Sequence, residues 1–149
     1  MRFFVDCEFT SFDACQLISV AIVGKDKREF YGECSDFERP LCSDFVRNVV
    51  LPKLGRYPGR SMPFPQLRSE LMAWLHQVPT KPAPVLCFDF QGDLQLVEHL
   101  IGGPLPSGWK TENVHSQLHA DRRMAYFEQH GGEHHALHDA RANACAYPG

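Results

Sequence analysis

The sequence contains no long apolar run. No stretch approaches the roughly 18 consecutive apolar residues by which a membrane-spanning helix is recognised. The acids Asp6 and Glu8 also stand where a secretory signal peptide would need its apolar stretch. We therefore expect a cytoplasmic protein that has no membrane partner.

Paired cysteines at metal-ligand spacing are also missing. None of the six cysteines belongs to a Cys-x-x-Cys pair. They are scattered through apolar segments, which favours reduced, mostly buried thiols over a disulfide framework. The six are Cys7, Cys15, Cys34, Cys42, Cys87 and Cys145.

The sequence has no excess of positive charge, because 15 Lys and Arg face 18 Asp and Glu, for a formal net charge of −3. Proteins that bind nucleic acid normally use Lys and Arg to contact phosphates, so the total argues against such a partner. The distribution is uneven, however, because no acid lies among five basic residues in one segment. These are Arg47, Lys53, Arg56, Arg60 and Arg68. The segment is either a phosphate-facing rim or a solvated basic face without a partner.

The size and composition predict a single domain over residues 1–149. The chain is 44% hydrophobic and 22% charged, which is the balance of a globular domain with a real core. No internal repeat or linker interrupts it. Periodicity and breakers predict strands over 3–9, 17–23 and 29–34, helices over 45–54 and 67–75, a strand over 85–90, a helix over 93–101, a short strand over 113–118, and helices over 121–129 and 137–147.

The order of these elements predicts an α/β fold. Short connections between the first three strands indicate an antiparallel meander, and the later alternation of helix and strand indicates parallel partners. We expect a mixed five-stranded sheet flanked by helices. Pro52 should end or kink the helix over 45–54, and the prolines and glycines of 57–65 indicate a loop.

The first chemical signal lies in the strand over 3–9. Asp6 and Glu8 are two residues apart, so they project from the same face, about 6–7 Å apart at the backbone. Two like charges on an otherwise apolar strand are costly unless a cation neutralises them. Oxygen ligands suit hard ions such as Mg²⁺ or Mn²⁺.

The second signal lies in the closing segment 133–143. Its alanines would let a helix pack closely on other elements, and Asp139 is an acid in an otherwise weakly charged stretch. Taken alone, Asp139 is either a ligand for a metal at the sheet or an exposed helix acid.

Three motifs together resemble the histidine branch of the DEDD exonuclease superfamily, which has a ribonuclease-H-like fold. The first, Phe4–Thr10, is an apolar strand ending in Asp-x-Glu and a small hydroxyl residue. The second, Gly92–Val97, has an acid that begins a helix before two apolar residues. The third, His134–Ala140, separates His from Asp by four residues. The motifs follow the family order, and the layout is most similar to small bacterial, mycobacterial and phage-type exoribonucleases.

The resemblance implies a metal-dependent 3′-to-5′ exoribonuclease that releases nucleoside monophosphates. His134 would be the general base of a two-metal-ion hydrolysis. The acids that would hold the two divalent ions, Mg²⁺ or Mn²⁺, are Asp6, Glu8, Asp93 and Asp139.

The same resemblance implies where the substrate lies. Phe9, Thr10 and Phe12 would stand where the family holds the terminal sugar and base, and aromatic rings suit single-stranded nucleic acid. Core packing explains the two phenylalanines equally well. RNA is favoured over DNA as the partner, and because members of the family often form dimers, a homodimer is a further expectation.

Several alternatives stay open. Asp89 competes with Asp93 as the third acid, although the family pattern places the acid after a glycine at the start of a helix. His135 and His138 compete with His134, but only His134 has the required offset from Asp139. A zinc site is a further alternative, with ligands from His130, His134, His135 and His138. The alternative functions are a DNA exonuclease of the proofreading type and a non-catalytic nucleic-acid-binding module.

Overall fold

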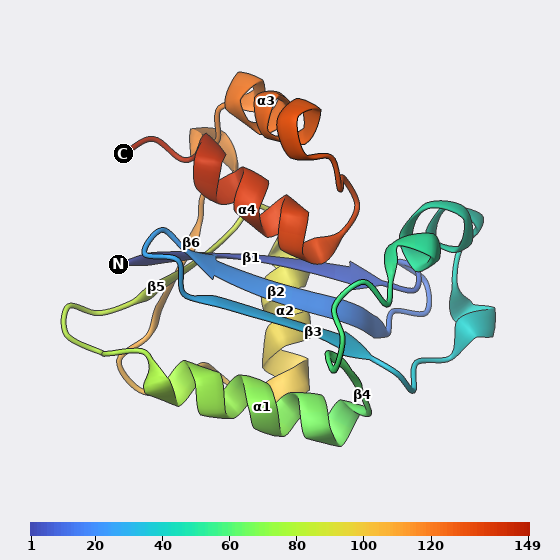
Figure 1. Ribbon diagram of the computed structural model, residues 1–149. Coiled ribbons are helices and arrows are strands. Elements are labelled where there is room, and N and C mark those ends of the chain that lie inside the picture. The colour runs from blue at the N-terminus through green and yellow to red at the C-terminus, as the bar shows by residue number, and fades with distance from the viewer.

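The computed structural model describes residues 1–149 as a mixed sheet between layers of helices (Figure 1). Its six strands lie in the order β4-β3-β2-β1-β5-β6. The meander β1-β2-β3 is antiparallel, as the sequence predicts, whereas β5 pairs in parallel with β1, β6 with β5, and β4 with β3. The strands are β1 Arg2–Phe9, β2 Leu17–Gly24, β3 Glu29–Cys34, β4 Ser61–Met62, β5 Val85–Phe88 and β6 Lys110–Asn113.

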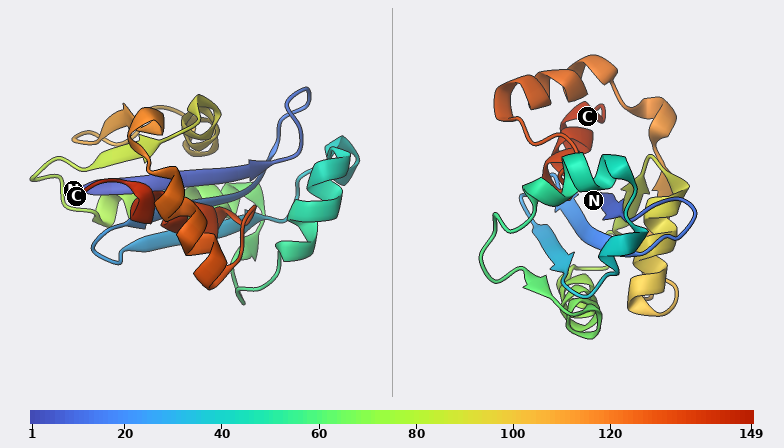
Figure 2. Two further views of the ribbon diagram at one scale, coloured as in Figure 1. Left: turned by 90° about the horizontal axis from the view of Figure 1, so that it is seen from above. Right: turned by 90° about the vertical axis from the view of Figure 1, so that its right-hand side faces the viewer.

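Four α-helices cover the two faces of the sheet. Helices α1 and α2 pack on one face, and α4 packs on the other with α3 outside it (Figures 1 and 2). Their bounds are α1 Phe64–Gln77, α2 Gln91–Ile101, α3 Ala120–His130 and α4 Ala136–Ala146. Short helical turns complete the chain: η1 Arg39–Leu41, η2 Val46–Val50, η3 Leu51–Lys53 and η4 His115–Gln117.

The alternation of β1 sorts its side chains between the two faces. Phe3 and Val5 are fully buried in the main core with α1 and α2, whereas Phe4 lies in a separate apolar cluster on the α4 side. Strand β2 is buried at all eight positions because helices cover both of its faces. Each buried aliphatic or aromatic side chain stabilises the fold by about 1.5–3 kcal/mol. Four of the six cysteines are buried, and all six are free.

The sheet differs from the sequence prediction at its edges. The expected fifth strand over 113–118 was wrong, because β6 ends at Asn113 and residues 115–117 form η4. A sixth strand, β4, lies in the segment expected to be a loop. Strand β6 reads Lys-Thr-Glu-Asn and β4 has two residues, so neither carries an apolar alternation that a sequence could reveal.

The helix expected over 45–54 divides into a π-helical turn, η2, and a 3-10 turn, η3. Pro52 lies in η3, where its missing N–H cannot donate to a preceding carbonyl. The predicted helix is therefore interrupted close to Pro52, as the sequence predicts.

No helix anywhere in the fold combines the length and apolar character that crossing a bilayer would require.

Candidate active site

Acidic side chains from separate parts of the chain meet at the carboxyl end of β1. Asp6 and Glu8 lie on β1, Asp139 lies in the first turn of α4, and Asp93 lies in the first turn of α2. Asp89 follows the end of β5, just before α2. The negative side chains at the start of α2 and α4 are also favoured by the positive end of each helix dipole.

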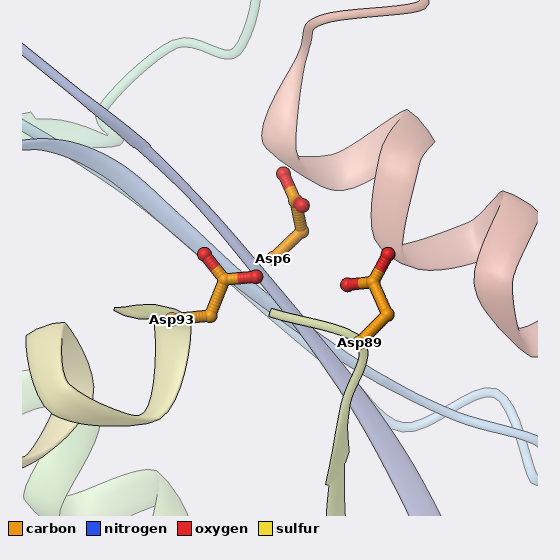
Figure 3. Close-up of side chains that lie close together, drawn as sticks. All are labelled: Asp6, Asp89 and Asp93. Carbon is orange, nitrogen blue, oxygen red and sulfur yellow. The ribbon is translucent and has the colours of Figure 1, made fainter. Parts of the chain in front are cut away.

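The acids form two groups that share one member. Asp6, Glu8 and Asp139 can each offer an oxygen such that all three oxygens lie within 4.8 Å of one another, and Asp6, Asp89 and Asp93 do the same. Figure 3 shows the carboxylates of the second group turned toward a common region. Asp6 is therefore the side chain on which both groups depend.

None of these carboxylates is neutralised by a direct ion pair. Asp93 is only 2% exposed and Asp139 only 5% exposed. None of the acids forms an ion pair with a lysine or arginine, and atom Oδ2 of Asp6 is buried without a hydrogen-bond partner. Buried acidic oxygens without donors are costly unless a cation satisfies them. An all-oxygen set of this kind fits a hard divalent ion.

The protonation of the acids reflects the same burial. Burial, followed by Asp139, raises the pKa of Glu8 to about 9. Burial and the nearby Asp89 raise the pKa of Asp93 to about 8. Burial also raises the pKa of Asp139 to about 6, and burial followed by Asp139 raises that of Asp6 well above its ordinary value. In the metal-free protein Glu8 and Asp93 therefore hold protons near neutral pH, which a bound cation would displace.

His134 lies at the rim of this cluster. Its backbone N–H donates a 3.1 Å hydrogen bond to Oδ1 of Asp139, and its backbone is left-handed, with φ of 66°. The imidazole packs edge-to-face on Phe45 at 5.0 Å between centroids, and its Nε2 lies 3.8 Å from a carboxylate oxygen of Glu133. The ring makes no hydrogen bond with the clustered acids and stays accessible from solvent.

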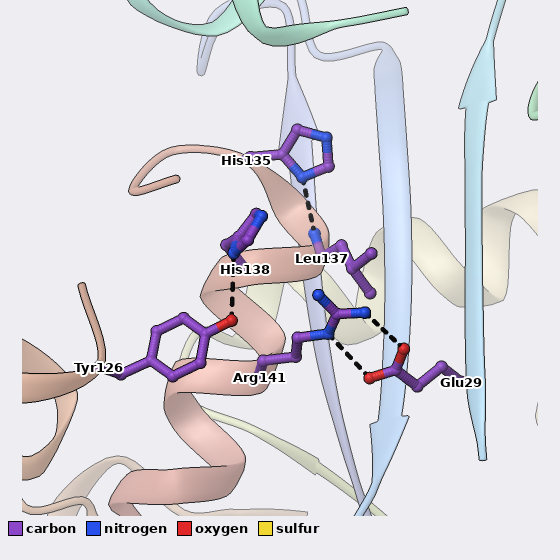
Figure 4. A network of polar contacts seen from close by, with 6 residues as sticks. All are labelled: Glu29, Tyr126, His135, Leu137, His138 and Arg141. Carbon is purple, nitrogen blue, oxygen red and sulfur yellow. Dashed lines mark hydrogen bonds and ion pairs between the residues drawn. The ribbon is translucent and has the colours of Figure 1, made fainter. Parts of the chain in front are cut away.

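The neighbouring histidines occupy different surroundings. His135 is 1% exposed, stacks on Tyr31 at 4.9 Å, and accepts a hydrogen bond from the backbone N–H of Leu137 (Figure 4). Burial lowers the pKa of His135 to about 4, so its ring is neutral at physiological pH. Nδ1 of His138 lies 3.1 Å from the hydroxyl of Tyr126. No histidine belongs to a group of three side chains placed to hold a metal, so the geometry does not support the zinc alternative.

An aromatic surface adjoins the acids through Phe90, which follows Asp89. Phe9, Phe12 and Phe90 contact one another, with centroid separations of 5.2, 6.1 and 6.2 Å. Phe12 is 81% exposed and Phe90 is 43% exposed. The three rings line a hollow of about 330 Å³. Phe90 was not predicted from the sequence, in which its one signal is its place three residues before Asp93.

Thr10 and two of the basic residues are engaged within the fold. Thr10 is fully buried, and its hydroxyl accepts a 2.9 Å hydrogen bond from the backbone N–H of Gln16. That hydroxyl is therefore committed to its own loop. Arg60 pairs with Glu70, and Arg68 donates to the backbone of α2. The basic segment 47–68 is consequently not one continuous free rim.

Comparison with known proteins gives partial relatives. No family model matches the chain. Over 55 residues it is 40% identical to proteins named 3′-5′ exoribonuclease from two strains of Mycobacterium tuberculosis, CDC 1551 and H37Rv. The match covers 36% of this chain and 33% of each relative, so it spans about a third of the relatives' length.

A solved structure resembles nearly the whole chain. The crystal structure of cell-death related nuclease 4 matches it with a TM-score of 0.56 at 15% identity, over 95% of this chain and 60% of that one. The fold is ribonuclease-H-like. This confirms the predicted fold class, with six strands in place of five. Here Asp6 and Glu8 lie on β1, inside the sheet, and the acids of α2 and α4 come from the first turns of those helices.

Proposed function

We propose that this chain is a metal-dependent 3′-to-5′ exonuclease of the DEDD histidine branch and that it shortens RNA from its 3′ end. The observation that carries the proposal is the sharing of Asp6 between two groups of acids. Hydrolysis by two ions needs a pair of sites about 3.5–4 Å apart that bracket one phosphate, and a shared carboxylate is suited to bridge them.

The side chains divide between the two ions by their grouping. Asp6, Glu8 and Asp139 would hold one ion, and Asp6 with Asp93 would hold the other. When bound, Mg²⁺ or Mn²⁺ lowers the pKa of a water molecule and neutralises charge at the phosphate. That positive charge also explains how a chain of net charge −3 can bind a polyanion.

His134 is the proposed general base. Imidazole is the side chain that most often accepts a proton in general-base catalysis. Its accessible ring at the rim, with its backbone tied to Asp139, supports this role because a base must reach the attacking water beside the acids. Phe45 packs against the ring and would limit its orientations.

The aromatic surface is the proposed binding site for the terminal nucleotides. Base stacking on exposed rings is worth about 1–3 kcal/mol per base and accepts any sequence. We assign this role to Phe9 and Phe12 and add Phe90, which joins them across the hollow. RNA is chosen over DNA because the partial relatives are named exoribonucleases.

The experiment uses RNA and DNA oligonucleotides of the same sequence, labelled at the 5′ end. We expect stepwise shortening of RNA with Mg²⁺ or Mn²⁺, none with chelator, and slower shortening of DNA. Asp139→Asn should lose the activity, and Asp13→Asn, which changes an exposed acid outside both groups, should keep it. Equal shortening by Asp139→Asn, or none by the wild type with either metal, would overturn the proposal.

Three expectations stay predictions. They are the single domain over residues 1–149, the cytoplasmic location and the homodimer. Light scattering on the purified chain measures the last of these directly.

A further inference from the structure

Asp89 lies beside Asp6 because β5 pairs with β1. The two strands are parallel, with Phe4 opposite Cys87. Side chains two residues apart along a strand share a face, so the next positions on that face are Asp6 and Asp89. Both side chains are thereby placed on the α4 side of the sheet, and Asp93 meets them from the first turn of α2.

The three carboxylates meet closely. Oxygens of Asp6, Asp89 and Asp93 lie within 4.8 Å of one another, and in Figure 3 they face a shared region from three different elements. Asp93 is only 2% exposed. Atom Oδ2 of Asp6 is buried and has no hydrogen-bond partner. A buried acidic oxygen without a partner, beside two further carboxylates, is favourable when a cation binds among them.

Asp89 has no structural task that would otherwise explain it. It makes no ion pair, and it does not cap α2, whose N-cap residue Phe90 has no side-chain cap hydrogen bond. A strand-end acid with neither role should be repelled by two neighbouring carboxylates. Its position is favourable only if a cation lies between them.

We propose that Asp89 is a direct carboxylate ligand of the ion held by Asp6 and Asp93. This inference rests on the proposed function and deepens it. Each ion then has three carboxylates around it, with Asp6 common to both. Because affinity for hard cations rises with the number of charged ligands, the chain can bind both ions before any nucleic acid arrives.

The test measures Mn²⁺ binding by calorimetry in the absence of nucleic acid. The wild type should bind two ions. Asp89→Asn should weaken one of them by on the order of tenfold or more and leave the other nearly unchanged. The matched control Asp13→Asn removes the same charge from an exposed position and should bind as the wild type does. Unchanged binding of both ions by Asp89→Asn would overturn the inference.

Thermal unfolding separates metal binding from folding. Without metal, Asp89→Asn should unfold at the same temperature as the wild type or a higher one, because the substitution removes one of three crowded acids. Added Mn²⁺ should raise the unfolding temperature of the wild type more than that of the variant. A metal-free variant that unfolds at a lower temperature would show that Asp89 supports the fold instead, which also overturns the inference.

The two proposals can fail separately. If Asp89→Asn binds Mn²⁺ as the wild type does while Asp139→Asn still loses RNA shortening, only the inference about Asp89 is wrong. If the wild type binds no Mn²⁺ without RNA but still shortens RNA with either metal, the inference alone is wrong. If it neither binds Mn²⁺ nor shortens RNA with either metal, both are wrong.

Discussion

The backbone N–H of His134 donates a 3.1 Å hydrogen bond to Oδ1 of Asp139. One turn of chain thus joins the proposed base to a proposed metal ligand at the start of α4. The same turn holds His134 at a φ of 66°, which few residues other than glycine adopt readily. A backbone strained next to candidate catalytic groups is the arrangement expected where function outweighs local stability.

Substitution of His134 should separate stability from activity. A non-glycine residue in the left-handed region costs about 1 kcal/mol, so His134→Gly should be more stable than His134→Ala by about that amount. Both variants should shorten RNA on the order of 10²–10⁴-fold more slowly, because both lack the base. Urea unfolding and single-turnover assays measure the two effects. Equal stability of the two variants, or wild-type rates in either, would contradict the account.

The metal-free protein should lose stability as the pH rises from about 7 to 9. The pKa of Glu8 is raised to about 9 and that of Asp93 to about 8, whereas both ionise near pH 4 in the unfolded chain. Between those values the folded state binds more protons, so deprotonation favours unfolding as the pH increases. His135 does not interfere, because its pKa of about 4 leaves it neutral throughout this range.

Urea unfolding in chelator at several pH values tests this slope. Asp93→Asn should flatten it, because the amide does not titrate, and saturating Mg²⁺ should also reduce it. A metal-free wild type that becomes more stable over the same range, or a slope unaltered in Asp93→Asn, would contradict the assigned protonation.

The aromatic surface should contribute to substrate binding. Phe90→Ala should weaken binding of single-stranded RNA by about 1–3 kcal/mol for the base it stacks, and Phe12→Ala by a similar amount. Fluorescence anisotropy in the inactive Asp139→Asn background measures this without degradation. Met124→Ala is the control, because Met124 is 61% exposed on α3 and lies outside the three-ring surface. Wild-type affinity in Phe90→Ala would remove Phe90 from the site.

Much of the fold could be read from local patterns. Strands β1 to β3 carry clear apolar periodicity and short connections, and Asp6 and Glu8 share a face simply because they are two residues apart. The bounds of β6 were not predicted, because it is a polar edge strand whose pairing partner, β5, lies over 20 residues earlier in the chain.

The sequence did not assign Asp89 or Phe90 to the candidate site. Asp89 reads as an ordinary strand-end acid, and Asp93 was preferred to it, whereas the structure places both beside Asp6. That convergence depends on the register of β5 against β1, which no local pattern encodes. The proposed role of Phe90 likewise depends on its contacts with Phe9 and Phe12, which join segments that are far apart in the sequence.

Anomalous scattering from crystals grown with Mn²⁺ measures whether the acids around Asp6 hold two cations. Two ions are expected, one in contact with Asp6, Glu8 and Asp139 and the other in contact with Asp6 and Asp93. Crystals in Mn²⁺ that show no ion bound to Asp6 would contradict this expectation.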